Sequence, residues 1–228
     1  MIILIEDIID WDVSNWSKAI DFWEDALSQT NENIEALELG GNKGGLSLWL
    51  ASKGYSVICS DLNSPEENAK ELHKKYNLDK KIQYVAINAT AIPFENKFDV
   101  IIFKSILGGI SGGGNDHLMQ QTIDQIYKSL KPGGLLFFAE NLESSAMHRF
   151  IRKRFVSWGA RWNYLKYKDI EPLFQQFSEL NYQTIGFFGT FGRTEKQRRI
   201  LSKLDKFLHK LIPKSKKYIA YGIAKKKD

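Results

Sequence analysis

Residues 36–61 read ALELGGNKGGLSLWLASKGYSVICSD, and this stretch decides the fold. With the two residues before it, it divides into four predicted elements: a buried strand at 34–39, a glycine-dense turn at 40–45, a helix that opens at Leu46, and a strand at 57–60 that ends at Asp61. A strand, a glycine-rich turn, a helix and an acid about 20 residues further on form the plan of a nucleotide-binding βαβ unit. Glycines let the backbone approach a ligand, and the helix N-terminus offers free N–H groups.

The glycine spacing distinguishes two classes of nucleotide site. A dinucleotide site requires G-x-G-x-x-G. Counted from Gly40, the second glycine falls on Asn42, so that pattern is not met. Glu38, Gly40 and Gly44 instead match E/D-x-G-x-G-x-G, again with Asn42 at the middle glycine. Asn adopts left-handed backbone geometry more readily than most residues. The stretch therefore resembles the first motif of class I S-adenosylmethionine methyltransferases; an ordinary strand-to-helix turn is the alternative.

Three later stretches extend this resemblance. Residues 88–94 (NATAIPF) are similar to the family's Asp-Ala-x-x-Leu-Pro-Phe segment, with Asn88 in place of the acid. Residues 98–103 resemble its fourth strand, and residues 130–134 (LKPGG) resemble the turn before its fifth. The pieces keep the family's order from residue 34 to residue 141. The resemblance implies an α/β fold with a Rossmann-like, doubly wound, seven-stranded sheet whose last strand is antiparallel.

The length predicts a single methyltransferase domain over residues 1–228. Its expected parts are an N-terminal lid helix within 1–33, a cofactor-binding core at 34–141, a substrate cap at 142–181, and a basic amphipathic helical insert at 192–217, between the last two strands. The helix at 13–27 carries Trp16, Ile20, Trp23 and Leu27 on one face, which also fits packing on the sheet edge. After the fifth strand we expect helices at 143–155 and 169–180, an irregular stretch from Trp158 to Tyr167, and strands at 182–188 and 218–224.

In doubly wound sheets, ligands bind at the carboxyl ends of the strands. The resemblance implies S-adenosyl-L-methionine as the cofactor and no metal. The expected cofactor-binding residues are Glu38, Gly40, Gly41, Asn42, Gly44, Asp61, Leu62, Asn88, Ala89, Lys104 and Ser105. Among them, Asp61 would accept hydrogen bonds from the ribose diol, and Lys104 would lie near the methionine part or the substrate.

The usual catalytic base of the family is missing. Many small-molecule methyltransferases carry histidine a few residues after strand four, where this chain has LGGI at 107–110. The remaining candidates for a catalytic role are Glu140, His148 and His117, and we predict the first two. His117 is also explained as an ordinary residue of a first helical turn. Glu140 is as readily explained as a helix cap, and His148 as part of a solvated basic helix.

Charge is unevenly distributed along the chain. Residues 1–140 hold 12 Lys and 20 acids, a net charge of −8, whereas residues 141–228 hold 20 cations and 7 acids, a net charge of +13. The basic part predicts an anionic partner, namely a small-molecule, sugar or lipid-linked acceptor. In the insert, an apolar stripe of Ile200, Leu204, Phe207, Leu208 and Leu211 runs beside many cations. Such a helix either contacts an anionic membrane or packs on the protein's own sheet. The oligomeric state stays open.

These features favour a methyltransferase that acts on a small or glycan-precursor acceptor, by O-methylation. An RNA methyltransferase is the runner-up because basic and aromatic residues are interleaved after residue 148. We expect no specific nucleic-acid substrate, since strand four is followed by KSIL rather than Asn/Asp-Pro-Pro-Tyr, and Cys59 does not follow a proline. A non-catalytic protein of the same fold is the third possibility. The single cysteine favours a cytoplasmic location. The basic amphipathic insert adds the expectation of peripheral contact at the inner membrane face.

Overall fold

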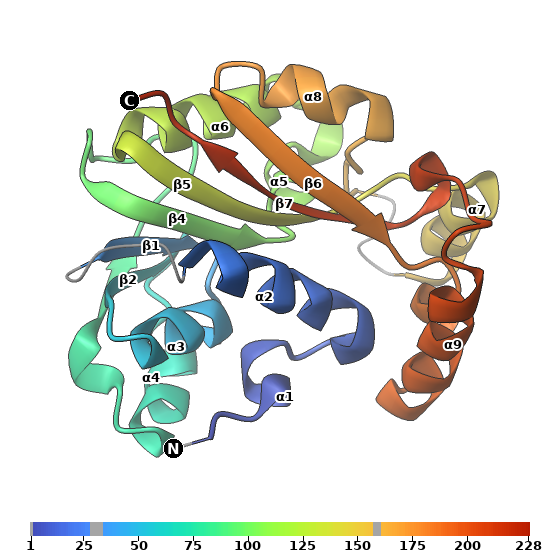
Figure 1. Ribbon diagram of the computed structural model, residues 1–228, viewed down its shortest axis with the longest axis horizontal. Coiled ribbons are helices and arrows are strands. Elements are labelled where there is room, and N and C mark those ends of the chain that lie inside the picture. The colour runs from blue at the N-terminus through green and yellow to red at the C-terminus, as the bar shows by residue number, and fades with distance from the viewer. Residues whose placement is uncertain (1, 28–33, 157–160) are drawn as a thin grey trace.

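The computed structural model describes residues 2–27, 34–156 and 161–228. Its centre is a seven-stranded sheet of order β3-β2-β1-β4-β5-β7-β6 (Figure 1). The strands are β1 (Glu35–Leu39), β2 (Ser56–Asp61), β3 (Ile82–Ala86), β4 (Phe98–Lys104), β5 (Leu130–Asn141), β6 (Glu179–Ile185) and β7 (Ile219–Lys225). The first five strands are parallel, and β7 runs antiparallel to both β5 and β6. The predicted fold class is confirmed.

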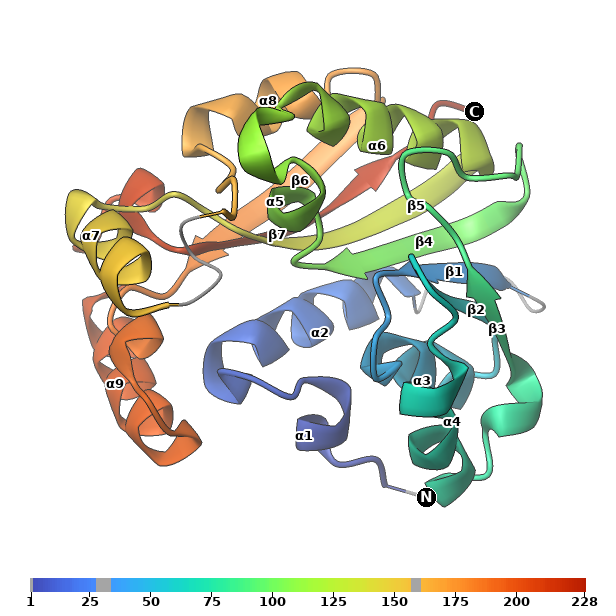
Figure 2. The same cartoon turned by 180° about the vertical axis from the view of Figure 1, so that it is seen from behind.

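Helices cover both faces of the sheet. They are α1 (Ile5–Ile8), α2 (Val13–Leu27), α3 (Gly45–Ser52), α4 (Glu66–Lys75), α5 (Leu107–Ile110), α6 (His117–Ser129), α7 (Ala146–Phe155), α8 (Ile170–Leu173) and α9 (Glu195–Leu208). Helices α1 to α4 lie on one side of the sheet and α5, α6 and α8 on the other, while α7 and α9 lie together at one end (Figures 1 and 2). Each face of the sheet packs into its own apolar core. The layering leaves the carboxyl ends of β1, β2 and β4 beside α1.

Helix α2 has the predicted bounds and buries its predicted apolar face. The ring of Trp23 stacks on Phe137 of β5 with centroids 5.8 Å apart, and its indole Nε1 donates to the Gly222 carbonyl of β7 at 3.0 Å. This helix therefore packs on the sheet. The short segment before it, residues 6–10, is what lies against the site described below. The lid role of the N-terminal helix within 1–33 stays a prediction.

Three boundaries after β5 differ from expectation. The helix expected at 169–180 ends at Leu173 as α8, and β6 begins at Glu179, because Leu180 pairs with Ala224 of β7. Backbone pairing along the sheet edge takes precedence there over a helical apolar pattern. Helix α7 begins at Ala146, where the Ser145 side chain caps it by accepting the His148 N–H. The expected irregular stretch begins at Trp158, which lies outside the described residues.

Candidate functional site

The glycine-rich turn is held in left-handed backbone geometry. Gly40, Asn42 and Gly44 have φ of 68°, 43° and 69°. Asn42 has the left-handed backbone conformation expected of the middle glycine of the motif. Asn tolerates this conformation better than most residues. A Cβ on Gly40 would lie 2.3 Å from Ile106 Cγ2, and one on Gly41 would lie 2.8 Å from Cys59 Sγ. Neither position has room for a side chain.

A cavity of about 570 Å³ opens beside this turn, at the carboxyl ends of β1 and β4. Of the residues predicted for the cofactor, Glu38, Gly40, Gly41, Asn42, Lys104 and Ser105 line it. Lys43 and Gly45 of the predicted turn also line it. The lining further includes residues that the sequence did not point to: Glu6, Asp7, Ile8, Asp10, Leu46, Asn68 and Leu72. The N-terminal segment forms one wall. That wall approaches closely because residue 45 is glycine: a Cβ there would lie 2.2 Å from the Ile8 carbonyl oxygen.

Glu38 is buried at the base of the cavity. Its Oε2 accepts the backbone N–H of Ser47 at 2.9 Å and the Ser47 hydroxyl at 2.5 Å. The carboxylate thereby satisfies a free N–H in the first turn of α3, the position at which a negative charge is most favourable. Burial nevertheless raises the pKa of Glu38 to about 7, and the bonds from Ser47 oppose that rise. Glu38 thus links the strand, the turn and the helix that frame the cavity.

The other predicted cofactor residues are not part of the cavity lining. Asp61 ends β2, and its carboxylate accepts the N–H groups of Asn42 at 3.1 Å and Leu62 at 2.7 Å. The side chain of Leu62 is exposed. Asn88 follows β3, where its Oδ1 accepts the Thr90 N–H at 3.0 Å. Two more complete the set: Ala89 packs against the apolar core, and the Gly44 carbonyl contacts His73 Nε2 at 2.8 Å.

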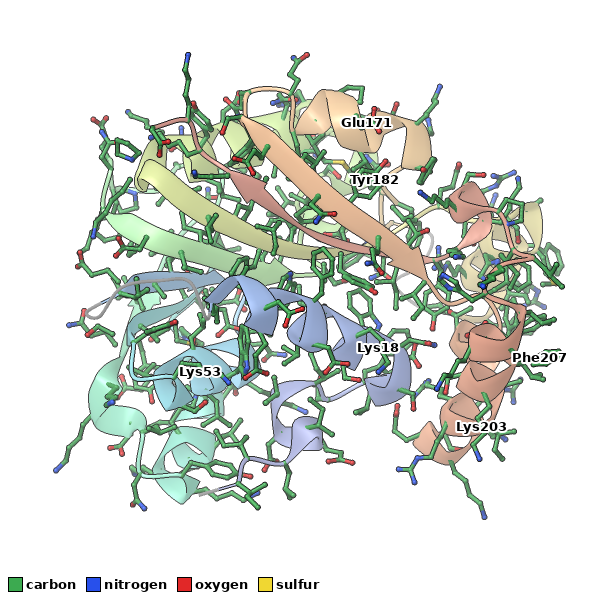
Figure 3. All side chains as sticks on the ribbon, in the orientation of Figure 1. Lys18, Lys53, Glu171, Tyr182, Lys203 and Phe207 are labelled. Atoms are coloured by element: carbon green, nitrogen blue, oxygen red, sulfur yellow. The ribbon has the colours of Figure 1, made fainter. Side chains whose placement is uncertain are left out.

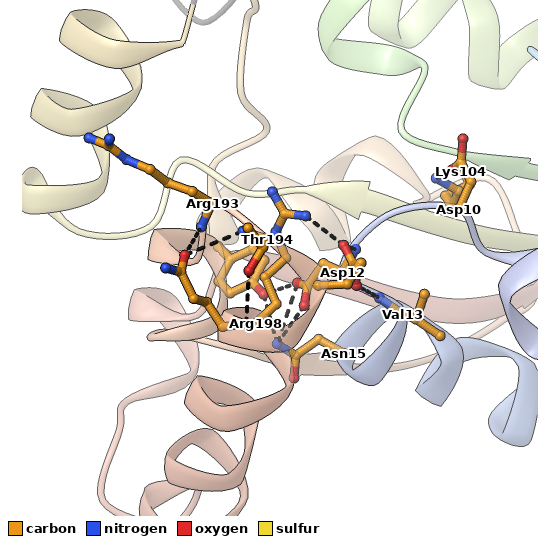
Figure 4. A network of polar contacts seen from close by, with 11 residues as sticks. Asp10, Asp12, Val13, Asn15, Lys104, Arg193, Thr194 and Arg198 are labelled. Atoms are coloured by element: carbon orange, nitrogen blue, oxygen red, sulfur yellow. Dashed lines mark hydrogen bonds and ion pairs between the residues drawn. The ribbon is translucent and has the colours of Figure 1, made fainter.

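Opposite charges face each other across the cavity. Asp10 lies 3.4 Å from the Lys43 ammonium and 4.0 Å from that of Lys104. Lys104 also lies over the ring of Trp16, 5.1 Å from its centroid. Burial lowers the pKa of Lys104, and the carboxylate of Asp10 opposes the shift. Asp10 and Lys104 are drawn together in Figure 4. The cavity therefore presents two cations and at least one carboxylate to a ligand.

The two predicted catalytic residues do not line this cavity. Glu140 accepts the N–H groups of Ile106 at 3.0 Å and Leu107 at 2.9 Å through Oε2, and burial raises its pKa to about 7. It holds the chain where β4 leads into α5, which is the capping role considered as the alternative.

His148 is fully buried, so the solvated basic helix expected as its alternative is not what surrounds it. Its Nδ1 contacts the Ser145 hydroxyl at 2.7 Å and its Nε2 contacts the Phe187 carbonyl at 2.9 Å. The rings of Phe187, Phe191 and Tyr218 surround it. Burial lowers the pKa of His148 to about 4. A catalytic role for Glu140 or His148 stays a prediction. The hydrogen bonds described here give each residue a structural role.

A polar network joins the cavity wall to α9. Glu195, in the first turn of α9, accepts the N–H groups of Asp12 at 3.0 Å and Val13 at 3.2 Å, at the start of α2 (Figure 4). Arg198 holds Glu195 at 2.5 Å. The Asp12 carboxylate accepts the hydroxyl of Tyr218, and burial raises the pKa of Asp12 to about 7. These bonds fix the segment that carries Asp10.

Known proteins share this architecture. Residues 37–138 match the family model described as a methyltransferase domain. Over 125 residues the chain is 30% identical to the carboxy-S-adenosyl-L-methionine synthase of Hydrogenovibrio crunogenus, a match that covers 52% of this chain and 48% of that protein. Over 128 residues it is 23% identical to the tRNA 5-carboxymethoxyuridine methyltransferase of Escherichia coli K12, covering 54% and 47%. The matches thus span about half the length of these curated relatives.

Among solved structures, phosphoethanolamine N-methyltransferase 2 of Haemonchus contortus, in complex with phosphomonomethylethanolamine and S-adenosylhomocysteine, superposes with a TM-score of 0.64. It is 15% identical, and the superposition covers 100% of this chain and 61% of that one. Over residues 37–138 the chain is similar to class I S-adenosylmethionine-dependent methyltransferases. At this identity the structural likeness shows the fold.

S-adenosylmethionine is the cofactor of this methyltransferase family, and the residues present fit it. The ligand has a carboxylate, an ammonium and a ribose diol. Lys43 and Lys104 supply positive charge, and Asp10 supplies negative charge within the same cavity. Asp61 is the acid at the end of β2. The turn at Gly40 and Gly41 has no side chains to obstruct a bound group. The methyltransferase domain therefore provides complementary chemistry for each end of the cofactor.

Proposed function

We propose that this protein transfers the methyl group of S-adenosylmethionine to an oxygen of a small acceptor that carries negative charge, such as a glycan precursor. One observation carries the proposal: a single cavity unites the glycine-rich turn, Glu38 and the lysine pair Lys43 and Lys104. Similarity to the family supports the transfer of a methyl group from this cofactor. The nature of the acceptor rests on the charges of the cavity and of the C-terminal part.

Positioning is the main contribution that this chain's residues make to the reaction. A methyl group on a sulfonium requires an aligned acceptor in a dry site, and such alignment is worth several kcal/mol. The turn at 40–45 and Glu38 are rigidly held, because backbone N–H groups and Ser47 bind the Glu38 carboxylate. Lys104, at the end of β4, then attracts the carboxylate of the cofactor or the negative charge of the acceptor.

A hydroxyl acceptor also needs a group that takes its proton. Glu140 and His148 direct their polar atoms to backbone and side-chain partners away from the cavity. We assign this role to Asp10, a cavity residue that forms ion pairs with Lys43 and Lys104. Asp10→Asn keeps the size of the side chain and removes its ability to accept a proton. We expect Asp10→Asn to lower kcat by about a hundredfold. It should also weaken cofactor binding, because Asp10 supplies the negative charge that complements the ammonium of the cofactor.

An RNA acceptor is the second candidate. It is favoured by the similarity to the E. coli tRNA methyltransferase and by the net charge of +13 on residues 141–228. That similarity covers 54% of this chain. Basic charge alone gives non-specific RNA binding that falls steeply with salt. The segment after β4 has the sequence KSIL and lacks the Asn/Asp-Pro-Pro-Tyr pattern used on exocyclic amines of bases.

Methyl-labelled S-adenosylmethionine distinguishes the two acceptor classes. The protein is incubated separately with bulk tRNA, with a small-molecule extract and with a lipid extract, at near-physiological salt. We expect label in a small or lipid-linked acid and none in RNA. Asp10→Asn serves as the matched inactive control. Robust labelling of tRNA by the wild type, and not by Asp10→Asn, would replace the small acceptor with RNA.

A further inference from the structure

One end of the molecule exposes apolar side chains that the fold does not cover. Seven of the ten exposed large apolar side chains in the described part of the chain come from α7 and from α9 with the turn after it. They are Met147, Phe150, Phe155, Ile200, Leu204, Phe207 and Leu211. We call this surface the α7–α9 face. Phe207 is 84% exposed and Leu211 is 78% exposed, so these side chains lose contact with water only if something outside the fold covers them.

The α7–α9 face has a fixed orientation, because polar bonds hold the opposite side of α9. Asp205 is buried and accepts the N–H groups of Phe187 at 2.8 Å, Phe188 at 2.7 Å and Gly189 at 2.9 Å. Glu195 holds the start of α2. Rolling α9 to bury Leu204 and Phe207 would break these bonds and leave buried N–H groups unpaired. The alternative that the stripe packs on the protein's own sheet is therefore wrong.

Cations surround the apolar side chains. The exposed ones on α9 and the turn after it are Lys196, Arg199, Lys203, Lys206, Lys210 and Lys214, and those on α7 are Arg149, Lys153 and Arg154. Figure 3 shows Lys203 and Phe207 on the side of α9 that faces away from the sheet. The two helices lie beside each other at the same end in both views (Figures 1 and 2). Exposed apolar side chains and basic groups are thus gathered at one end of the protein.

We propose that the α7–α9 face docks this protein on the surface of a membrane rich in anionic lipid. Amphipathic helices with cations beside bulky apolar side chains bind in the plane of such interfaces, where lysines and arginines meet lipid phosphates. A nucleic-acid surface would use the cations and would leave Ile200, Leu204 and Leu211 exposed to water. In the described residues, no helix is long and apolar enough to cross a bilayer, and docking of this kind needs none.

The docking face and the cavity are physically joined. Glu195, in the first turn of α9, binds the backbone of Asp12 and Val13, and Asp10 two residues earlier lines the cavity (Figure 4). A docked enzyme would hold its cavity at a fixed position relative to the lipid surface. The inference goes beyond the proposed function, because docking concerns the surface and is measured without methyl transfer. The two can therefore fail separately.

Vesicle co-sedimentation of the full chain tests docking. Vesicles contain either phosphatidylcholine alone or phosphatidylcholine with phosphatidylglycerol. Two variants alter the face, Lys203→Glu with Lys210→Glu, and Phe207→Ser with Leu211→Ser. The matched control reverses two lysines on a different side of the protein, Lys18→Glu with Lys53→Glu (Figure 3). All proteins are first compared by circular dichroism and thermal unfolding.

We expect wild-type protein and the control to bind vesicles that contain phosphatidylglycerol, with binding that weakens as salt rises. Both variants of the α7–α9 face should bind at least about tenfold more weakly. Lys203→Glu with Lys210→Glu removes cations that attract the lipid surface, and Phe207→Ser with Leu211→Ser removes apolar side chains that would enter it. Equal binding by Lys203→Glu with Lys210→Glu and by the lysine control would overturn the proposal, because general charge would then explain it. Absence of binding at low salt, or equal binding to phosphatidylcholine alone, would also overturn it.

Discussion

The cavity and the α7–α9 face use charge in opposite ways. Around the cavity, charged groups have partners inside the fold: Glu38 binds Ser47, and Asp10 faces Lys43 and Lys104. On the α7–α9 face, exposed cations lie beside exposed apolar side chains. Paired charges define a small site with a fixed shape. Exposed cations and uncovered apolar groups instead fit a large, deformable partner. The same chain therefore has a preformed pocket at one place and an exposed apolar and basic surface at another.

The largest expected effect tests how rigid the pocket is. Gly40→Ala places a Cβ 2.3 Å from Ile106 and should abolish measurable binding of S-adenosylhomocysteine. Gly54→Ala is the matched control, because Gly54 has a φ of 98° and its added Cβ meets nothing within 4 Å. Both variants carry a left-handed strain of about 1–2 kcal/mol, so thermal unfolding should shift in each. Calorimetry should show intact affinity for Gly54→Ala alone. Equal affinities would contradict the geometry of the turn.

Two buried acids, Glu38 and Glu140, should make the stability of the protein depend on pH. The folded state raises the pKa of Glu38 and of Glu140 to about 7 from 4.5, so it keeps protons that the unfolded chain releases. Each acid therefore makes stability fall as pH rises from about 4.5 to 7, by about 3 kcal/mol. Glu140→Gln and Glu38→Gln should each remove part of this slope in urea titrations between pH 5 and 8.

These two variants should differ in ligand binding. Glu38 lines the cavity and Glu140 does not, so Glu38→Gln alone should weaken the binding of S-adenosylhomocysteine. A stability difference from wild type that is the same at pH 5 and at pH 8 would show that neither carboxyl has a raised pKa. An affinity loss of the same size in both variants would show that Glu140 contributes to binding.

Lys104→Met tests the cationic side of the pocket. The change keeps the length of the apolar stem and removes the charge. We expect S-adenosylhomocysteine to bind about tenfold more weakly, because one charge-assisted hydrogen bond is lost. Lys18→Met is the control, since Lys18 lies on the outer surface of α2 paired with Asp21 at 3.0 Å. Calorimetry compares the two. Unchanged affinity in Lys104→Met would remove this lysine from the cofactor site.

The smallest expected effect concerns the exposed face. Phe207→Ser should change the free energy of unfolding by less than about 0.5 kcal/mol, because the fold does not use this side chain. Phe137→Ala, at a fully buried ring in β5, should cost about 3–5 kcal/mol. Urea unfolding measures both. A large loss of stability in Phe207→Ser would mean that the ring packs within the protein.

The parts of the fold that the sequence predicted are local in the chain. Strand β1, the glycine-rich turn, α3 and β2 follow one another directly, and Glu38 and Asp61 lie within 24 consecutive residues, so the spacing carries the motif. Asp10 was missed because it reaches the cavity only when α1 packs against Gly45. The burial of His148 depends on Phe187 and Phe191, which follow it by about 40 residues and join it through β6 and β7. Apolar periodicity predicted the helix α9. It did not predict which face of α9 is buried, because that depends on the tertiary structure.

Calorimetric titration of the wild-type protein with S-adenosylhomocysteine tests the central claim most directly. The cavity at the ends of β1 and β4 combines the glycine-rich turn with complementary charges. We predict one site per chain with a roughly micromolar Kd, about 8 kcal/mol of binding free energy. Absence of binding up to roughly millimolar ligand, in protein shown to be folded, would contradict the assignment of this cavity to the cofactor and the function built on it.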